Sequence, residues 1–384
     1  MSRPTGAMDL AISHFTESHG HRPAGVWMAP GRANLIGEHT DYNEGYVLPF
    51  ALSKAVYVAG SARNDGMVSV TSSPFGTVEL EMQAPLRDDW GRYPEAAIRA
   101  MRGHGIDPPG MDLVIESDVP VGAGLSSSAA LLCGIILAAS QLAGSTLTPE
   151  GIASLARQAE ADWVGVPVGI MDQLASMCST RDHALFLDCR SLAHRQVRLD
   201  RSDGDGRLAL LVIDTGVRRR LVEGEYARRR KTCEEVATLL GVPALRDVTT
   251  EMLEANRDLL DQTQLKRARH VVTENERVLD TVGVLGGQGL RAIGNLLSES
   301  HRSLATDYEV SVAALDLVVT AAEAAGALGA RMTGAGFGGC VIALVTGDSI
   351  GPVTESIEVA FAAQGLDRPS YFEARPGPGA HRVA

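Results

Sequence analysis

The stretch VPVGAGLSSSAALLCGIILAASQLAG, residues 119–144, contains the strongest structural signal of the sequence. In it, the segment GAGLSSSAA (122–130) leads directly into an apolar helix. Glycine lets the backbone approach a ligand closely, and a helix start offers amide donors and the positive end of the helix dipole. The junction therefore favours an anion such as phosphate, although an ordinary capped strand-to-helix turn has the same pattern.

This segment differs from both common nucleotide-binding motifs. A Walker loop would follow its glycines with Lys-Ser or Lys-Thr, and a dinucleotide fingerprint would have a third glycine. A second run, TGAGFGG (333–339), does match G-x-G-x-x-G, but it leads into the strand-like CVIALV rather than a helix. We expect it to form a turn near the first glycine segment; the alternative is a plain tight turn before a strand.

The segment APGRANLIGEHTD (29–41) contains Arg32, Glu38, His39 and Asp41 in an otherwise apolar stretch. Charges in such a stretch need partners. These side chains suit the recognition of a polyol, because carboxylates and imidazole make several hydrogen bonds to hydroxyl groups. A metal site is disfavoured, since the spacings are too short for common helical ligand pairs and HExxH is absent. A solvated loop is the remaining alternative.

Other charged side chains stand in contexts that favour a plain structural role. In GVPVGIMDQLAS (165–176), Asp172 stands at the start of a short helix, where acidic residues complement the helix dipole. Glu160, taken by itself, is predicted to be a surface residue of its helix. The basic clusters GVRRR (216–220) and ARRRK (227–231) have acidic neighbours, so they predict the solvated face of a helix rather than a nucleic-acid site.

Composition limits the classes of function. The 384 residues suffice for one or two globular units, and 45% hydrophobic with 21% charged residues is ordinary globular usage. A net charge of -12 opposes general affinity for nucleic acid or acidic membranes. The N-terminal segment lacks the apolar core of a secretory signal, and the apolar run 129–139 is too short to span a bilayer. Five cysteines without short paired spacing predict reduced thiols in a cytoplasmic protein.

Local patterns predict a mixed fold. Strands are expected at 46–61, 67–72, 77–82, 111–117, 184–188, 196–199, 208–215, 341–345 and 371–374. Helices are expected at 8–17, 94–102, 149–164, 171–179 and 353–364, with mainly helix from 216 to 326. Asn64-Asp65-Gly66 predicts a hairpin between the first two strands. Because strict βαβ repetition is missing, α+β with two domains, 1–200 and 201–384, fits better than a doubly wound sheet.

Together and in this order, these segments resemble the motifs of the GHMP small-molecule kinases. GRANLIGEHTDYNEG (31–45) is similar to a sugar-binding signature, VPVGAGLSSSAA (119–130) to the phosphate loop, VGIMDQ (168–173) to the catalytic segment and MTGAGFGG (332–339) to the third motif. The first motif resembles that of the branch that phosphorylates galactose. The visible departure is Ala33, where the family usually has valine, a small change that affects no catalytic group.

The resemblance implies both a fold and an activity. The fold would be α+β, with an N-terminal domain like domain 2 of ribosomal protein S5, a ferredoxin-like C-terminal domain and the active site in the cleft between them. The activity would be ATP-dependent phosphorylation of α-D-galactose at its anomeric hydroxyl, the first committed step of galactose metabolism. Galactose and MgATP would be the ligands of a cytoplasmic monomer, with Mg²⁺ as cofactor and no nucleic acid, membrane or protein partner.

The resemblance also implies roles for individual residues. Asp172 would accept or orient the proton of the anomeric hydroxyl, and Arg32 would stabilise its carboxylate and offset charge on the transferred phosphoryl group. Magnesium would be held by Ser128 and Glu160. The positions that match sugar-binding residues are Glu38, His39, Thr40, Asp41, Gly169 and Tyr226. Those that match nucleotide-binding residues are Ser72, Gly122, Ala123, Gly124, Leu125, Ser126, Ser127 and Ser128.

Three alternatives stay open from the sequence. The chain could phosphorylate a related sugar such as N-acetylgalactosamine, since pocket walls decide that preference. It could be a non-catalytic sensor of galactose and ATP, although such sensors differ at the phosphate loop, which is intact here. A dinucleotide-dependent oxidoreductase would rest on TGAGFGG alone.

Overall fold

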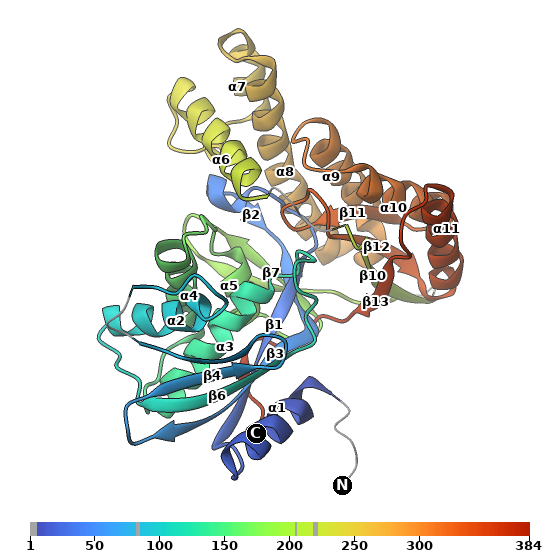
Figure 1. Cartoon of the computed structure of the whole chain (residues 1–384). Coiled ribbons are helices and arrows are strands. Elements are labelled where there is room, and N and C mark those ends of the chain that lie inside the picture. Colours follow the sequence, from blue (N-terminus) through green and yellow to red (C-terminus); the bar gives the residue numbers. More distant parts are fainter. Residues whose placement is uncertain (1–5, 82–84, 204–205, 218–221) are drawn as a thin grey trace.

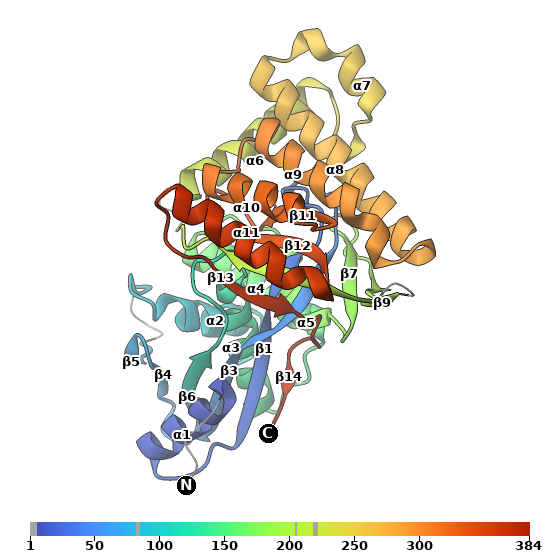
Figure 2. The same ribbon diagram turned by 90° about the vertical axis from the view of Figure 1, so that its right-hand side faces the viewer.

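The computed structural model describes residues 6–81, 85–203, 206–217 and 222–384. Figure 1 shows a strand-rich part with the N-terminal half of the chain and a second part in which helices α9, α10 and α11 gather near another sheet, while α6 and α7 lie at the top beside α8. The turned view in Figure 2 shows the same two parts joined by strands β1 and β3. The combination of mainly antiparallel sheets with segregated helices confirms the α+β class.

The first sheet has the strand order β14-β1-β3-β6-β4-β5. Its strands are β1 (Gly25–Asn34), β3 (Pro49–Arg63), β4 (Val68–Ser72), β5 (Gly76–Glu79), β6 (Gly110–Ser117) and β14 (His381–Arg382). The helices around it are α1 (Ala7–His19), α2 (Arg92–Gly103), α3 (Ser127–Leu142), α4 (Pro149–Gln158) and α5 (Met171–Cys178). Helix α3 is apolar almost all round because it is enclosed by β1, β3 and the other helices.

The predicted hairpin between β3 and β4 is wrong. The turn at Asn64-Asp65-Gly66 exists, but β6 lies between the two strands, pairs with β3 over residues 56–63 and runs parallel to β4. Turn residues identify a change of direction, whereas the partner of a strand depends on tertiary packing. The third expected strand, 77–82, is observed as β5, and residue 82 lies outside the described residues.

A bulge in β1 sets the direction of the Arg32 side chain. The register with β3 shifts between Pro30 and Arg32, and Pro30 lacks the amide that a regular ladder would use. At Gly31 a Cβ atom would come within 2.6 Å of the Leu125 carbonyl oxygen, so only glycine fits. The bulge therefore turns Arg32 toward the segment 122–128.

The second sheet has the order β11-β12-β10-β13, with β9 paired to β10. Its strands are β9 (Ser202–Asp203), β10 (Gly206–Asp214), β11 (Gly329–Thr333), β12 (Cys340–Thr346) and β13 (Ser370–Ala374). The helices of this part are α6 (Val222–Leu239), α7 (Thr250–Ala255), α8 (Gln262–Gly287), α9 (Gly294–Thr306), α10 (Ala313–Ala324) and α11 (Ile350–Ala363). Strand β11 was not predicted, because GARMT has neither β-branched enrichment nor apolar alternation.

The two parts share an apolar cluster. It joins Leu35, Phe50 and Leu125 of the first part to Leu210 and Ile342 of the second. A small sheet of β2 (Tyr46–Val47), β7 (His183–Asp188) and β8 (His194–Arg198) packs at the same junction. The C-terminal strand β14 returns to pair with β1. These contacts join residues that precede the polar stretch 199–207 to residues that follow it. The boundary at 200/201 therefore remains a proposal about how the sequence is divided, and it does not separate two independent bodies.

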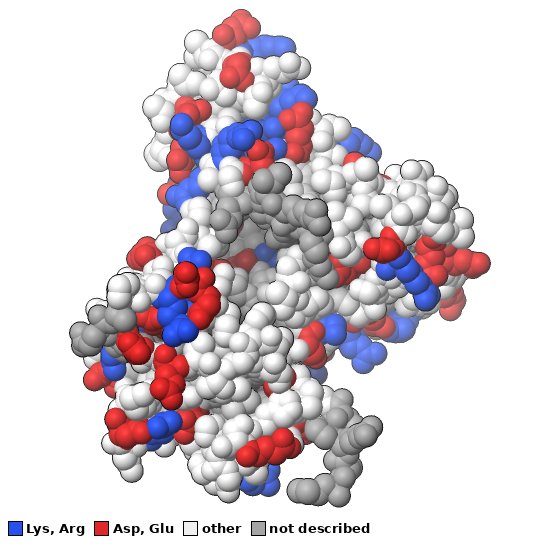
Figure 3. Space-filling view, in the orientation of Figure 1, with Lys and Arg blue, Asp and Glu red and all other residues white. Residues whose placement is uncertain are grey.

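The charged side chains of the surface test the prediction that the basic clusters form a solvated face. Acidic and basic side chains are interspersed over the face in Figure 3, so the described residues of this face carry no large patch of a single charge. The expected solvated face at 227–231 is wrong for Arg229, which is buried, bonds to Glu225 and lies 4.9 Å over the Phe337 ring. Cluster 216–220 lies largely outside the described residues. Within the described part of the chain, no helix has the length and apolar character needed to cross a bilayer.

Candidate active site

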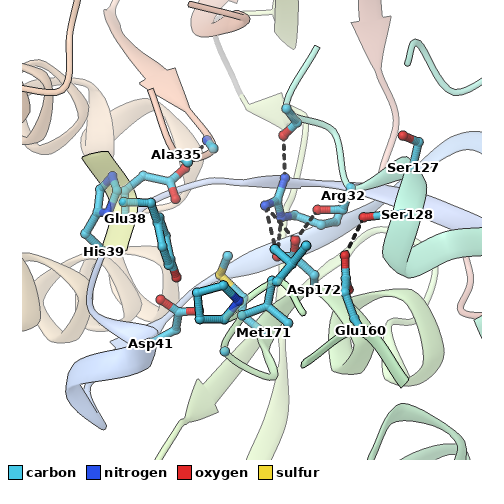
Figure 4. Close-up of a pocket in the computed structure, with 18 of the residues that line it drawn as sticks. Arg32, Glu38, His39, Asp41, Ser127, Ser128, Glu160, Met171, Asp172 and Ala335 are labelled. Atoms are coloured by element: carbon cyan, nitrogen blue, oxygen red, sulfur yellow. Dashed lines mark hydrogen bonds and ion pairs between the residues drawn. The ribbon is translucent and has the colours of Figure 1, made fainter. Parts of the chain in front are cut away.

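A cavity of about 270 Å³ opens where the two parts meet. The segments singled out in the sequence converge on it: 32–41, 122–128 and 166–172, together with Glu160, Tyr226 and the turn at 334–335. Figure 4 shows Glu38, His39 and Asp41 on one side, Ser127, Ser128 and Glu160 on the other, and Arg32 with Asp172 between them. Residues far apart in the sequence therefore form one site.

The centre of the cavity is an ion pair between Arg32 and Asp172. Arg32 comes from the β1 bulge and Asp172 from the first turn of α5. Nε and Nη2 of Arg32 donate to the two carboxylate oxygens at 2.9 and 3.1 Å, and the Ser126 hydroxyl donates to the same carboxylate. Nη1 of Arg32 donates to the Gly124 carbonyl at 2.6 Å. This bidentate geometry fixes the orientation of the carboxylate.

The glycine-rich segment forms the start of α3, as its pattern predicted. Gly122 and Gly124 have φ angles of 74° and 83°, and Ser126 adopts the left-handed region at 56°, which is uncommon for a residue with a side chain. Such outliers occur where a backbone is shaped for a ligand. The turn and the helix N-terminus together offer amide donors and a positive dipole end to an anion in the cavity.

Glu160 lies beside this helix start and is buried, so the surface position indicated by sequence is wrong. The predicted helix 149–164 is α-helical to Gln158 and then widens into a π-helical turn, Ala159–Val164, which carries Glu160. Such turns are frequent at functional sites. The Ser128 hydroxyl donates to Oε1 of Glu160 at 2.7 Å, and Gln173 donates to Oε2 at 2.8 Å.

The Ser128–Glu160 pair fits a hard divalent cation. Burial, above all, and the nearby charge of Asp172 raise the pKa of Glu160 to about 7 against the lowering effect of its hydrogen bonds and of Arg32, so a cation at this position would stabilise the ionised carboxylate. A hydroxyl and a carboxylate that share one edge of a phosphate-type cavity are the oxygen donors that Mg²⁺ prefers. The chemistry of this donor set therefore matches magnesium.

The opposite wall carries two carboxylates. Glu38, 2% exposed, accepts hydrogen bonds from the Gly334 amide at 2.6 Å and the Thr333 hydroxyl at 3.2 Å. Asp41 lies against Gly169, where a Cβ atom would come within 2.1 Å of its Oδ2. Burial, followed by the charge of Asp172, raises the pKa of Asp41 to about 7.

Aromatic side chains complete this wall. His39, with φ of 65°, shares a hydrogen bond of 2.9 Å with the Tyr42 hydroxyl, which in turn bonds to Tyr308 at 2.6 Å. The His39 and Tyr226 rings are 5.9 Å apart, and both residues line the cavity. The wall thus combines apolar ring faces with oriented polar groups, a composition suited to a sugar.

The groups that hold the Glu38 loop in place have no signature in the sequence. Arg331 of β11, fully buried, donates to the Asn34 and Leu35 carbonyls at 2.9 and 3.2 Å. Glu274 of α8 accepts from the Gly37 amide at 2.9 Å. Burial alone would raise the pKa of Glu274, but Arg277 and other nearby positive charge outweigh it and lower the pKa to about 2. Isolated charges on a helix and a weak strand give no sequence signal for such a network.

Among the described residues, four predicted site residues lie off the cavity wall. The Thr40 hydroxyl donates to the Gly37 and Tyr46 carbonyls, so it supports the loop. Ala123 and Leu125 are buried in the shared apolar cluster, and Ser72 is buried at the end of β4. The second glycine run behaves as expected: it leads into β12, and Gly334 and Ala335 line the cavity together with Gly122 and Gly124.

Comparisons with known proteins agree with this geometry. The family model of the galactokinase galactose-binding signature matches residues 13–62, the GHMP kinases N-terminal domain matches 92–180 and the GHMP kinases C-terminal domain matches 285–358. The chain is 48% identical to a galactokinase of Streptomyces coelicolor over 96% of its own length and 97% of that protein. It is 43% identical to a human galactokinase over 86% of each chain.

Solved structures give the same result for the fold. A Lactococcus lactis galactokinase complexed with galactose superposes with a TM-score of 0.92 at 33% identity, covering 98% of this chain and 100% of that one. A mevalonate kinase superposes with a TM-score of 0.65 at 18% identity, covering 91% of this chain and 98% of that one, which supports the fold alone. The two-domain GHMP kinase fold is therefore confirmed.

The substitution Asp41→Asn is expected to stabilise the unliganded protein at pH 8. Because the folded pKa of Asp41 is about 7 against an ordinary 3.8, its contribution to stability is present at low pH and is lost as pH rises toward 7. Asparagine does not ionise, so the gain in free energy of unfolding should grow between pH 5 and 7 and stay constant above. Denaturant unfolding across this range measures it. The control is Asp162→Asn, since Asp162 is exposed. An equal gain in the free energy of unfolding at pH 5 and pH 8 would contradict the raised pKa of Asp41.

The substitution Arg331→Lys is expected to weaken binding of the predicted sugar by about tenfold or more while nucleotide binding is unchanged. In Arg331, Nη1 donates to both loop carbonyls while Nε donates to the Ser300 hydroxyl at 3.1 Å. Lysine keeps the charge but has a single nitrogen, so it cannot make both sets of bonds, and charge-assisted hydrogen bonds contribute about 1.5–3 kcal/mol each. Calorimetry with each ligand measures both affinities. Arg277→Lys is the matched control, since Arg277 also pairs with Glu274 but is not seen to bond the loop. Equal losses in the two variants would refute this positioning role.

Proposed function

The chain belongs to the galactokinases of the GHMP kinase family, and from that premise we propose that it transfers the terminal phosphoryl group of ATP to the anomeric hydroxyl of α-D-galactose. It is a sugar kinase of galactose metabolism that uses ATP as co-substrate. The observation that carries the proposal is the order of groups across one cavity: the Glu38 and Asp41 carboxylates, then the Arg32–Asp172 pair, then the amide-rich turn 122–128. A hexose and a triphosphate would meet at Asp172.

We assign the proton transfer to Asp172. Its carboxylate would accept the proton of the anomeric hydroxyl as that oxygen attacks the terminal phosphorus of ATP, and the bond to the ADP oxygen breaks. Support comes from the Arg32 guanidinium, which holds the carboxylate bidentately and fixes the direction of its oxygens. Since phosphoryl transfer depends mainly on alignment and charge stabilisation, Arg32 would also offset charge that develops on the transferred group.

We assign the phosphates to the helix start and the magnesium to Ser128 and Glu160. The positive φ angles of Gly122 and Gly124 and the α3 N-terminus support the phosphate position. The shared hydrogen bond of Ser128 and Glu160 supports the metal position. When bound there, magnesium would neutralise charge on the phosphates. The role of the protein is to present oxygen donors on rigid elements beside the turn.

We assign galactose to the wall of Glu38, His39, Asp41, Gly169 and Tyr226. Carboxylates that accept hydrogen bonds from sugar hydroxyls reject analogues without those hydroxyls, because the buried oxygens would then lack partners. The close approach of Gly169 to Asp41 supports this assignment, since a side chain there would displace the carboxylate. The sugar-binding role of Thr40 and the nucleotide-binding role of Ser72 stay predictions. Thr40 would act indirectly, through its hydrogen bonds to the loop carbonyls.

We also propose a cytoplasmic location and a monomeric state. The five cysteines are free thiols, which suits a reducing compartment. The residues assigned to the sugar, the magnesium and the phosphates all belong to this chain.

The substitution Asp172→Asn is expected to lower kcat by about 10²–10⁴-fold while galactose and ATP still bind. Asparagine keeps the shape but cannot accept the proton. A coupled assay for ADP with galactose and MgATP measures kcat, and calorimetry measures binding. Asp162→Asn, an exposed carboxylate on the neighbouring π-helical turn, is the control. Near-normal turnover would remove Asp172 from catalysis, and a wild-type preference for N-acetylgalactosamine in the same assay would overturn the substrate.

The substitution Glu160→Gln is expected to raise the magnesium concentration needed for half-maximal activity by about tenfold or more, because a neutral amide is a weaker ligand than a carboxylate. Activity at fixed ATP over a magnesium series measures the shift. The KM for galactose should stay within about twofold, since Glu160 lies on the far wall from Glu38. An unchanged magnesium requirement would exclude Glu160 as a ligand.

A further inference from the structure

Three side chains outside the cavity present metal-ligand atoms to one another. Glu150 lies in the first turn of α4, Cys178 is the last residue of α5, and His194 is the first residue of β8. Their ligand atoms all lie within 4.8 Å of one another, and His194 Nε2 is 3.7 Å from Glu150 Oε1. These described residues do not line the active-site cavity, so the kinase chemistry leaves them without a role.

The hydrogen bond on the far side of the imidazole determines which nitrogen faces the cluster. His194 Nδ1 lies 3.1 Å from the Leu192 carbonyl oxygen, and a carbonyl can only accept. Nδ1 must therefore carry the hydrogen, and in the neutral ring Nε2 presents its lone pair toward Glu150 and Cys178. Histidines that bind metals are oriented in this way by a carbonyl or carboxylate on the other ring nitrogen.

The spacing suits a tetrahedral ion. Bonds of about 2.0–2.3 Å to nitrogen, oxygen and sulfur put neighbouring ligands about 3.3–3.8 Å apart in a tetrahedron. The His194–Glu150 distance already has this value. The Cys178 sulfur lies within 4.8 Å of both atoms, so it would have to approach them by about 1 Å at most. The Glu150 side chain, 53% exposed, can move with it and leave the fourth position to water.

The set of donors selects among metals. A thiolate, an imidazole and a carboxylate together suit Zn²⁺, whereas Mg²⁺ prefers oxygen alone. One thiolate and one carboxylate also balance the charge of a divalent ion, so the site would be neutral when filled. The kinase's own magnesium would therefore compete poorly here.

We propose that Glu150, Cys178 and His194 form a zinc-binding site separate from the active site. The ion would connect the start of α4, the end of α5 and the edge strand β8. Helices α4 and α5 already pack against each other, and Gln196 of β8 donates to the Cys178 carbonyl at 2.8 Å. Because α5 carries Asp172 at its other end, zinc would stabilise the scaffold that positions the catalytic carboxylate. The site is independent of the sugar and nucleotide assignments.

The test is a zinc titration of the full chain in excess magnesium without ATP, so that magnesium competes with zinc for any site made of oxygen donors. We expect the wild type to bind one Zn²⁺ per chain, and Cys178→Ser and His194→Asn each to weaken binding by at least about tenfold. Zinc should raise the Tm of the wild type and not of these variants. His183→Asn is the matched control: His183 makes the same Nδ1 contact to a carbonyl, that of Arg181 at 2.7 Å, without the thiol and carboxylate.

A second measurement does not depend on the variants. Cobalt(II) bound to the wild type should show a thiolate-to-metal charge-transfer band, which Cys178→Ser removes and Cys189→Ser retains. Galactokinase turnover in zinc-free buffer should be the same in wild type and His194→Asn. Absence of zinc binding by the wild type, binding that survives loss of Cys178 or His194, or a cobalt spectrum without a thiolate band would each overturn the proposal.

Discussion

The bidentate ion pair between Arg32 and Asp172 is the constraint on which the active site depends. It joins the β1 bulge to the first turn of α5, and through the Gly124 carbonyl and the Ser126 hydroxyl it also holds the phosphate turn. The Arg32 side chain is buried and that of Asp172 is 27% exposed, so removing the carboxylate would leave the guanidinium charge without its partner at a cost below the about 3–5 kcal/mol of a fully buried pair. The same contact that orients the carboxylate proposed for catalysis therefore also sets the distance between the wall proposed for the sugar and the turn proposed for the phosphates.

The second half of the chain acts on the site through the Glu38 loop. Arg331, Glu274 and the Gly334 amide all come from beyond residue 270 and bond to residues 34–38. The sugar wall is thus assembled only when both halves pack together. Asp41 and Glu160, whose pKa values are raised by burial to about 7, lower the stability of the unliganded protein once the pH rises above their ordinary values of 3.8 and 4.5. Ligands that bring hydroxyls or positive charge would offset this loss.

Sequence reasoning identified the fold class and the segments of the site because their signals are local. Glycines that need positive φ, a helix start and a charge-rich apolar stretch each carry their physical reason in adjacent residues. It failed where partners are distant. The strand paired with β3 is β6 rather than the adjacent β4, Arg331 and Glu274 are ordinary residues until the fold brings them to the loop, and Glu160 is buried only by its neighbours. The cluster of Glu150, Cys178 and His194 has no short spacing to reveal it.

The central claim is that one cavity holds a hexose between two carboxylates and Asp172, with the nucleotide phosphates against the start of α3. A crystal structure with galactose, magnesium and a non-hydrolysable ATP analogue tests it most directly. The account predicts the anomeric oxygen within hydrogen-bonding distance of the Asp172 carboxylate and in line with the terminal phosphate, with sugar hydroxyls on Glu38 and Asp41. A sugar bound with its anomeric carbon turned away from Asp172, or phosphates bound outside the turn 122–128, would contradict it.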